Sequence, residues 1–408
     1  MHTIKNQMGN FLNFNPVFLT NRVIFSTILY LLFHLIISLI NLDNIVWLIN
    51  YESILMISNG TPLYLQETLE RDGIIYYLPP AHFPVYFYFM AVFLIIFGPS
   101  EFLIRFITWL FVVFTYIILI KLIQPKEEKE IHLINVLYFL NPLLIVTNYF
   151  GKFDQFAIFF LFLGLYLASK GRISFAGFIL GLGVMVKLLP GVGIIGIIIS
   201  LYKNKRYKEI LTILKSSTSI IIVITSYFYL VYRNSFLSVI KFQVNRLTPN
   251  YSLWYYLLSD VSGIYIIIVQ FILLILVTYL MINFKKIDEP NSFYLFTALV
   301  SATYVLTTRQ HYNSYDLYTY YPLIPIIIQS LRSKEYKFIM LIFINFFIYM
   351  IGILSCESGC LRSNDVLPTI AWIGVILIFI ANSSILYILI NQNKNLKHEK
   401  LKSLDLLI

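Results

Sequence analysis

The residues able to do chemistry in this sequence gather in a few short stretches, and the first of these holds two carboxylates. Asp43 and Glu52 both follow the first long apolar run. Asp43 falls where a lipid headgroup would meet water, and it could act there as a general base or as the cap of an interfacial helix. Glu52 lies nearby on an Ile/Leu-rich amphipathic turn and is the competing carboxylate.

A second stretch combines cations with aromatic residues. The segment TTRQHYNSYDLYTYYPLIP contains Arg309, His311, Tyr315 and Asp316 between two apolar runs. An aromatic belt at a membrane surface accounts for the tyrosines, but it does not require an arginine and a histidine. We therefore expect a polar site at the outer ends of two helices.

Two further charged residues stand at breaks between apolar runs. Lys187 lies in GVMVKLLPG, where Pro190 frees backbone groups that must line a cavity or the surface. Two interpretations of Lys187 stay open, a snorkelling anchor and a cation that binds phosphate. Asp154, in NYFGKFDQF, precedes a predicted helix that it could cap and whose dipole it could complement.

The composition places all these residues in a membrane protein. The 408 residues are 59% hydrophobic and 12% charged, whereas soluble proteins carry roughly 25% charged residues. The net charge of +10 comes from short basic clusters between apolar runs, which argues against a nucleic-acid-binding face. Cys356 and Cys360 are the only cysteines, so no disulfide framework or cysteine-rich metal site is expected, and their redox state stays open.

The apolar runs predict an all-α, polytopic transmembrane helix bundle. We expect about twelve spans, separated by basic or turn-rich breaks and forming a single transmembrane domain over residues 1–408. The predicted helices cover residues 23–42, 102–123, 132–149, 155–169, 173–188, 189–202, 210–232, 261–283, 292–308, 318–331, 336–355 and 366–391.

The distribution of basic residues predicts the orientation of the bundle. With the amino terminus inside, 21 of the 30 basic residues fall on the inner side, which is the bias that the positive-inside rule describes. Both termini, including the tail over residues 392–408, are therefore expected in the cytoplasm. Residues 43–101 then form the longest extracytoplasmic loop, and long loops in compact proteins are usually functional.

One apolar stretch does not fit a span. Residues 78–97 are broken by three prolines at the start and end at Gly98. Counting this stretch as a span would give an odd total and would place the basic loop after residue 123 outside. We therefore predict interfacial helices within the first outer loop.

These features together resemble a family, the polytopic glycosyltransferases of the C superfamily that use polyprenyl-phosphate sugars, especially its mannosyltransferase-like branches. The resemblance runs through most of the chain, from Asp43 and SNGTPLY through YYLPPAHFPVYFYFMAVFLIIFGPSEFLIR to RQHYNSY. Its most specific part is NYFGKFDQF with the following glycine-rich helix and KLLPG. That part looks like the family's tryptophan-glycine-glutamine-x-aspartate turn and lysine-x-x-proline, but Phe150 and Lys152 replace the usual tryptophan and glutamine.

The resemblance implies a catalytic base in the first outer loop. Asp43 matches the family's acidic residue after the first helix and would activate the acceptor, with Glu52 as the alternative. The chemistry agrees, because a hydroxyl has a pKa far above neutrality and must lose its proton as its bond to the anomeric carbon forms.

The resemblance also implies a site for the donor phosphate. The leaving polyprenyl phosphate is anionic and needs cations rather than an acid, which suits Arg309, His311 and Lys187. Asp154 is implied to have a structural or substrate-positioning role, and Tyr315 is expected to position the substrate. No nucleotide is released, so no cofactor or phosphate-cradling glycine loop is required, and a requirement for a divalent metal stays open.

We therefore expect transfer of mannose or a similar sugar from a polyprenyl-phosphate donor to a lipid or glycan acceptor, in glycolipid or cell-envelope biosynthesis. The site would face outward from the plasma membrane, or into the endoplasmic reticulum in a eukaryote. A flippase or transporter is the competing class, and it should show an internal repeat and polar mid-membrane residues, neither of which is clear in this sequence. His34 is the histidine within the first apolar run, and it is better explained by helix packing than by a proton relay. A lipid-linked glycan polymerase or ligase would more usually place paired arginines in a large late loop.

Overall fold

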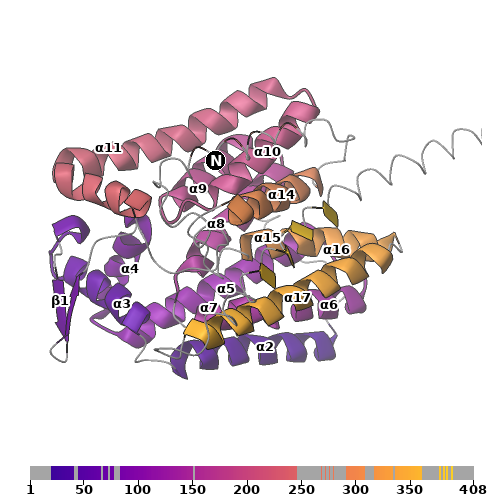
Figure 1. The fold of residues 1–408 in the computed structure, drawn as a ribbon, viewed down its shortest axis with the longest axis horizontal. Coiled ribbons are helices and arrows are strands. Elements are labelled where there is room, and N and C mark those ends of the chain that lie inside the picture. The colour runs from indigo at the N-terminus through magenta and orange to yellow at the C-terminus, as the bar shows by residue number, and fades with distance from the viewer. Residues whose placement is uncertain are drawn as a thin grey trace, which may run out of the picture.

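The computed structural model describes residues 20–40, 45–65, 68–71, 74–77, 83–149, 152–245, 291–307, 317–333 and 336–360, with single residues between 268 and 279 and between 376 and 388. This described part is helical apart from one short hairpin (Figure 1). The predicted helix bundle is therefore confirmed as the architecture.

The first half of the bundle follows the predicted boundaries closely, because each helix coincides with an apolar run. Its helices are α2 (Asn21–Ile40), α3 (Ile45–Ser58), α4 (Pro84–Phe97), α5 (Glu101–Ile123), α6 (Glu128–Phe139), α7 (Pro142–Tyr149), α8 (Asp154–Ser169), α9 (Ile173–Val184), α10 (Gly191–Lys203) and α11 (Tyr207–Asn245). The predicted helix over 132–149 is two helices, bent by 46° where Pro142 begins α7. Helix α11 is the exception, because it continues past the predicted end at residue 232 to Asn245, with non-helical backbone angles at Arg233.

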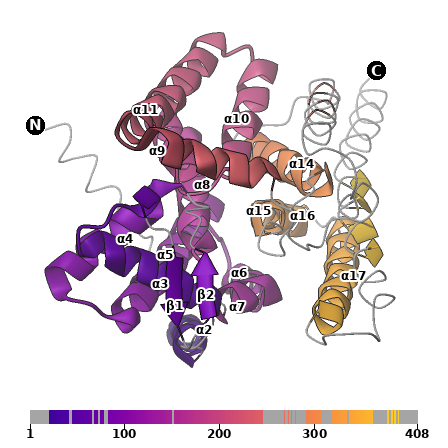
Figure 2. The same cartoon turned by 60° about the vertical axis from the view of Figure 1, so that its left-hand side comes forward.

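The described helices of the second half are α14 (Asn291–Thr307), α15 (Leu317–Tyr320), α16 (Leu323–Arg332) and α17 (Tyr336–Cys360). The predicted spans over 261–283 and 366–391 lie outside the described residues, except for single positions within each. Figure 2 shows α14 to α17 on one side of the molecule and α2 to α5 on the other.

The first outer loop contains helices and one element that the sequence analysis did not predict. Helices α3 and α4 are present in this loop, and their predicted position at the membrane interface stays a prediction. Between them, the single-turn 3-10 helix η2 (Leu63–Leu65) is followed by strands β1 (Thr68–Arg71) and β2 (Ile74–Tyr77), which pair antiparallel with Thr68 opposite Tyr77. Helix α4 begins at Pro84, where the fixed φ of proline suits the first helical turn.

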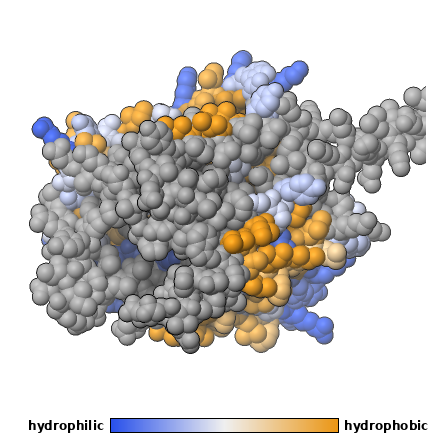
Figure 3. Space-filling model, viewed as in Figure 1, coloured by the Kyte–Doolittle hydropathy of each residue, from blue (hydrophilic) through white to orange (hydrophobic). Residues whose placement is uncertain are grey.

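Several helices expose apolar side chains that a soluble protein would bury. Phe25 on α2, Leu230 on α11 and Phe347 on α17 are 64%, 71% and 67% exposed. In Figure 3, apolar side chains gather on the side of α17 and along the lower edge, where α2 runs in Figure 1. These surfaces face lipid in an integral membrane protein, because in water they would favour association.

Within the described residues, three helices are long and apolar enough to cross a membrane, namely α2, α5 and α11 up to Arg233, and the bent pair α6 and α7 could form a fourth span. Helices α4, α8, α9 and α10 are apolar but shorter. The described part of the chain therefore establishes a membrane bundle without establishing the predicted number of spans.

Glycines allow close packing around α8, α9 and α10. A Cβ atom added to Gly177 on α9 would lie 2.1 Å from the Oγ of Ser216 on α11, and one added to Gly196 on α10 would lie 2.6 Å from the backbone nitrogen of Thr297 on α14. Small residues let helix backbones approach in this way in membranes. The contacts hold the α9–α10 turn, which carries Lys187, in a fixed place in the bundle.

Candidate active site

The turn between α9 and α10, the start of α8 and the start of α4 meet at one end of the bundle. The backbone nitrogen of Val85 donates to the carbonyl oxygen of Met185 at 3.3 Å, which joins α4 to the α9–α10 turn. The ring of Tyr86 stacks on that of Phe153, with centroids 4.8 Å apart, and so joins α4 to the residue before α8. Three segments that are distant in sequence therefore form one structural unit.

Asp154 and Lys187 form an ion pair inside this unit. The Lys187 ammonium donates to the Asp154 carboxylate, and the two side chains are 21% and 3% exposed. The ammonium also lies 5.7 Å from the centroid of the Phe153 ring. Lys187 is therefore directed toward an acidic partner that neither of its two sequence interpretations included.

The pairing also changes the interpretation of Asp154. The cap residue of α8 is Phe153, and Asp154 is the first residue of the helix proper. Its charge still complements the helix dipole, but its carboxylate binds Lys187 instead of capping the backbone. The interpretation of Asp154 as a helix cap is therefore wrong in its geometry.

Glu52 lies on α3, close to a second acidic residue, Glu101. Burial raises the pKa of the Tyr51 phenol, and the carboxylates of Glu101 and Glu52 raise it further. Tyr51 is 8% exposed, whereas Glu52 is half-buried. Glu101 is the first residue of α5, which is capped by the Ser100 hydroxyl accepting from the backbone nitrogen of Leu103. The start of α5 thus brings the Glu101 carboxylate next to α3. The role of Glu52 as the alternative base stays a prediction.

The other predicted site residues lie outside the described part of the chain. Asp43 belongs to the connection between α2 and α3, and Arg309, His311 and Tyr315 belong to the connection between α14 and α15. Their predicted roles therefore stay predictions. Cys356 and Cys360 fall in the last two turns of α17.

Arg105 is a residue that the sequence analysis missed. It lies in the first turns of α5, is 1% exposed, and donates from Nη1 to the carbonyl oxygen of Ser38 at 2.6 Å. One turn further along α5, the indole nitrogen of Trp109 donates to the carbonyl oxygen of Leu31 at 3.0 Å. These two contacts hold the carboxyl-terminal half of α2, which leads to Asp43. An arginine inside an apolar run was the available signal.

His34 has the packing role that its position in α2 predicted. Its side chain is fully buried, with Nε2 2.6 Å from the carbonyl oxygen of Phe139 and Nδ1 2.9 Å from the amide nitrogen of Asn148. A neutral imidazole that donates from Nε2 and accepts at Nδ1 satisfies both contacts. The packing interpretation of His34 is confirmed.

Among the residues that the structure describes, no group of three or more histidine, cysteine or acidic side chains could hold a metal ion. The described part of the site offers carboxylates, one lysine and aromatic rings. Such groups can bind anions and transfer protons.

The fold is shared with solved membrane glycosyltransferases. The structure is similar to that of ArnT from Cupriavidus metallidurans bound to undecaprenyl phosphate, with a TM-score of 0.50 and 15% sequence identity over 90% of this chain and 77% of that chain. The apo state of the same enzyme gives a TM-score of 0.50, 13% identity and the same coverage. At this identity the similarity establishes the fold of the C superfamily and nothing finer. No curated protein matches this chain.

These features define a polytopic membrane glycosyltransferase. The chain belongs to glycosyltransferase family 87, whose family model matches residues 78–308, more than half of the sequence. The resemblance seen in the sequence is thereby confirmed at the level of the superfamily and the enzyme class.

Proposed function

We propose that this protein transfers mannose or a similar sugar from a polyprenyl-phosphate donor to a hydroxyl group of a lipid or glycan acceptor. The observation that carries the proposal is membership of glycosyltransferase family 87 combined with the fold of an enzyme solved with undecaprenyl phosphate. The exposed apolar faces of α2 and α11 fit a protein that lies in the bilayer, where a lipid-borne donor is found.

The proposed reaction is a direct displacement at the anomeric carbon. Asp43, or Glu52 as the alternative, takes the proton from the acceptor hydroxyl as its oxygen bonds to that carbon. The bond between the carbon and the phosphate oxygen breaks, and polyprenyl phosphate leaves with the electron pair. A single displacement inverts the configuration at the anomeric carbon.

The cations are proposed to hold the phosphate of the donor. Arg309 and His311 would bind it directly, because a charge-assisted hydrogen bond compensates the anion as it leaves. Lys187 would add a third positive group, held in place by Asp154, and Tyr315 would position the substrate. The proposed steps require no cofactor, and a requirement for a divalent metal stays open.

The site is proposed to face the extracytoplasmic side, with both termini in the cytoplasm. The contact between α4 and the α9–α10 turn supports this arrangement, because the predicted topology puts both segments on the outer side. The membrane would be the plasma membrane, or that of the endoplasmic reticulum in a eukaryote.

The test of the proposed function uses the purified protein in lipid nanodiscs. Radiolabelled polyprenyl-phosphate hexoses and pentoses are offered with candidate lipid and glycan acceptors, and nucleotide sugars are offered in parallel. We expect transfer from one lipid-phosphate sugar and none from nucleotide sugars. Transfer from nucleotide sugars alone would refute the donor class, and movement of the lipid across a bilayer without transfer would indicate a flippase.

A further inference from the structure

Gln155 is a fully buried amide that the fold does not use. Its side chain is 0% exposed, and neither its Nε2 nor its Oε1 atom has a hydrogen-bond partner in the part of the chain that the structure describes. Burying an amide without partners destabilises a protein, and an apolar side chain of similar size would avoid that cost. The presence of Gln155 is therefore not explained by packing.

The position of Gln155 places it next to the proposed site. It is the second residue of α8 and follows Asp154, whose carboxylate binds Lys187. Successive residues of an α-helix are about 100° apart, so Gln155 lies on a different face from Asp154. The Gln155 amide is thus next to the ion pair in sequence but lies on a different face of α8.

The face that carries Gln155 is identified by a residue two turns further along α8. Phe162 lies seven positions on and therefore on nearly the same face, and its ring centroid is 6.3 Å from that of Tyr321 between α15 and α16. The face of α8 with Gln155 is thus the face toward the carboxyl-terminal half of the bundle. Gln155 lies about 10 Å nearer the site end than Phe162.

The start of α15, at Leu317, lies toward this same end of the bundle. From Tyr321, α16 runs toward Arg332, which contacts the carbonyl oxygen of Gln124 after the far end of α5. Helix α15, which directly precedes Tyr321, therefore lies on the side of Tyr321 away from Arg332, toward the end where α8 begins. Gln155 faces the half of the protein that supplies the proposed phosphate-binding residues, and it comes from the half that supplies Lys187.

The two unpartnered atoms of Gln155 indicate the chemistry of the missing partner. The amide nitrogen donates and the amide oxygen accepts, so a phosphate, which offers only acceptors, would leave Oε1 without a partner. A hydroxyl group both accepts and donates, and two neighbouring hydroxyls of a sugar ring can bond to both atoms together. A pyranose or furanose ring therefore fits the amide better than the phosphate does.

We propose that Gln155 binds the hydroxyl groups of the sugar that is transferred, and so contributes to the choice of sugar. This inference rests on the proposed function. Gln155 then orients the ring, while the proposed cations hold the phosphate and the proposed carboxylate receives the proton.

The test compares Gln155→Leu with Asn345→Leu as a matched control. Asn345 is also a buried amide, 2% exposed, but its nitrogen donates to the carbonyl oxygen of Ala381 at 2.5 Å and its oxygen accepts from the Tyr320 hydroxyl at 3.0 Å. We expect Asn345→Leu to lower the melting temperature of the protein in nanodiscs. We expect Gln155→Leu to keep or raise it, because no bond within the described protein is lost.

The transfer assay then decides the role of the Gln155 amide. With the donor that the wild type uses, Gln155→Leu should raise the KM for that donor about threefold to tenfold, the effect of losing neutral hydrogen bonds. Deoxy analogues of the donor sugar should lose less in the variant than in the wild type, because the variant has already lost the contact.

Each other outcome counts against the assignment. A fall in melting temperature like that of Asn345→Leu would show that the Gln155 amide has a structural partner. Unchanged KM and unchanged discrimination against deoxy sugars, beside an active wild type, would show that Gln155 does not touch the sugar. Failure of the wild type to transfer from any lipid-phosphate sugar would instead refute the proposed function itself.

Discussion

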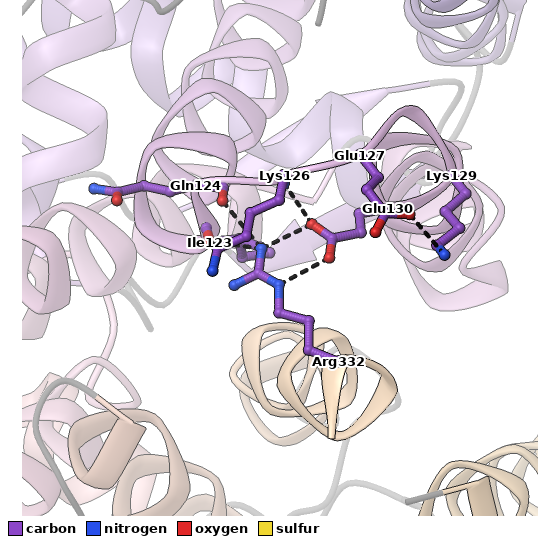
Figure 4. Close-up of polar contacts among 7 residues, drawn as sticks. All are labelled: Ile123, Gln124, Lys126, Glu127, Lys129, Glu130 and Arg332. Atoms are coloured by element: carbon purple, nitrogen blue, oxygen red, sulfur yellow. Dashed lines mark hydrogen bonds and ion pairs between the residues drawn. The ribbon is translucent and has the colours of Figure 1, made fainter. Parts of the chain in front are cut away.

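Arg332 and Glu130 form a bidentate ion pair (Figure 4). This pair joins the two halves of the bundle at the end opposite the candidate site. The Arg332 Nε and Nη2 atoms donate to Glu130 Oε1 and Oε2 at 2.8 and 2.7 Å. The backbone nitrogen of Lys126 donates to the same carboxylate at 2.6 Å, and Arg332 Nη2 reaches the carbonyl oxygen of Gln124 at 3.0 Å. Arg332 on α16 thus holds together the end of α5 and the start of α6.

We predict that Arg332→Ala destabilises the protein by about 3 kcal/mol, the lower end of the range for removing one partner of a buried pair. The reason is that the Glu130 side chain, 3% exposed, would keep its charge without its main partner. The change is measured by thermal unfolding in detergent, monitored as the loss of soluble, monodisperse protein.

The control is Arg206→Ala. Arg206 pairs with Glu209 on α11 through a contact of 2.5 Å, but both side chains are about one third exposed. Exposed pairs three residues apart on a helix contribute about 0.5 kcal/mol or less. Equal losses for Arg206→Ala and Arg332→Ala would contradict the view that the Glu130 pair joins the two halves.

The ion pair between Lys187 and Asp154 allows its structural and functional parts to be separated. Lys187→Met leaves a buried carboxylate and Asp154→Asn leaves a poorly neutralised ammonium, so each single change should lower thermal stability. The double variant removes both charges and should recover most of the loss, because the remaining groups are neutral.

The donor requirement of the double variant then distinguishes the roles of Lys187. If Lys187 also binds the donor phosphate, the apparent KM for donor should stay raised by about 10-fold or more although stability has recovered. A double variant with both normal stability and normal KM would restrict Lys187 to a structural role.

The late outer connection is tested with Arg309→Ala and His311→Ala. Both residues are proposed to bind the donor phosphate, so each change should raise the apparent donor requirement while protein abundance stays normal. Loss of a charged phosphate contact is worth about 1.5–3 kcal/mol, or roughly 10- to 150-fold. Donor binding measured by competition should weaken to match, and wild-type binding in both variants would remove the site from this connection.

The orientation of the bundle predicts which residues an impermeant thiol reagent can reach in intact cells. Cysteines introduced at Asp72 and Arg246 should be labelled from outside, whereas those at Lys129 and Lys205 should be labelled only after permeabilisation, because basic residues gather on the inner side. The background for this labelling is a chain in which Cys356 and Cys360 are replaced by serine. Labelling at position 205 from outside would reverse the predicted topology.

The sequence was sufficient for the fold wherever the signal was local. The helix predicted over 155–169 is observed as Asp154–Ser169, because apolar periodicity and a polar break mark its ends. The bend between α6 and α7 was not predicted, because the apolar run continues across Pro142, although a proline at this position indicates a bend. The hairpin of β1 and β2 was missed because four-residue strands give little periodicity.

Side-chain pairing over long distances could not be predicted from the sequence. Lys187 and Asp154 were each singled out, but nothing in one chain shows that residues 33 positions apart will meet. Gln155 was passed over because an uncharged amide is common in any helix, and only its burial without partners makes it informative. A sequence pattern thus located the unit while the fold showed how its members interact.

The most direct test of the proposed mechanism compares Asp43→Asn with Glu52→Gln in one assay that measures turnover, donor binding and abundance. Asparagine keeps the size of aspartate and its ability to cap a helix but accepts no proton near neutral pH. We predict that Asp43→Asn inserts and binds donor normally while turnover falls by about 100-fold or more, the contribution of a positioned base, and that Glu52→Gln stays active. An active Asp43→Asn beside an inactive Glu52→Gln would move the base to Glu52, and full activity in both variants would contradict a catalytic carboxylate in the first outer loop.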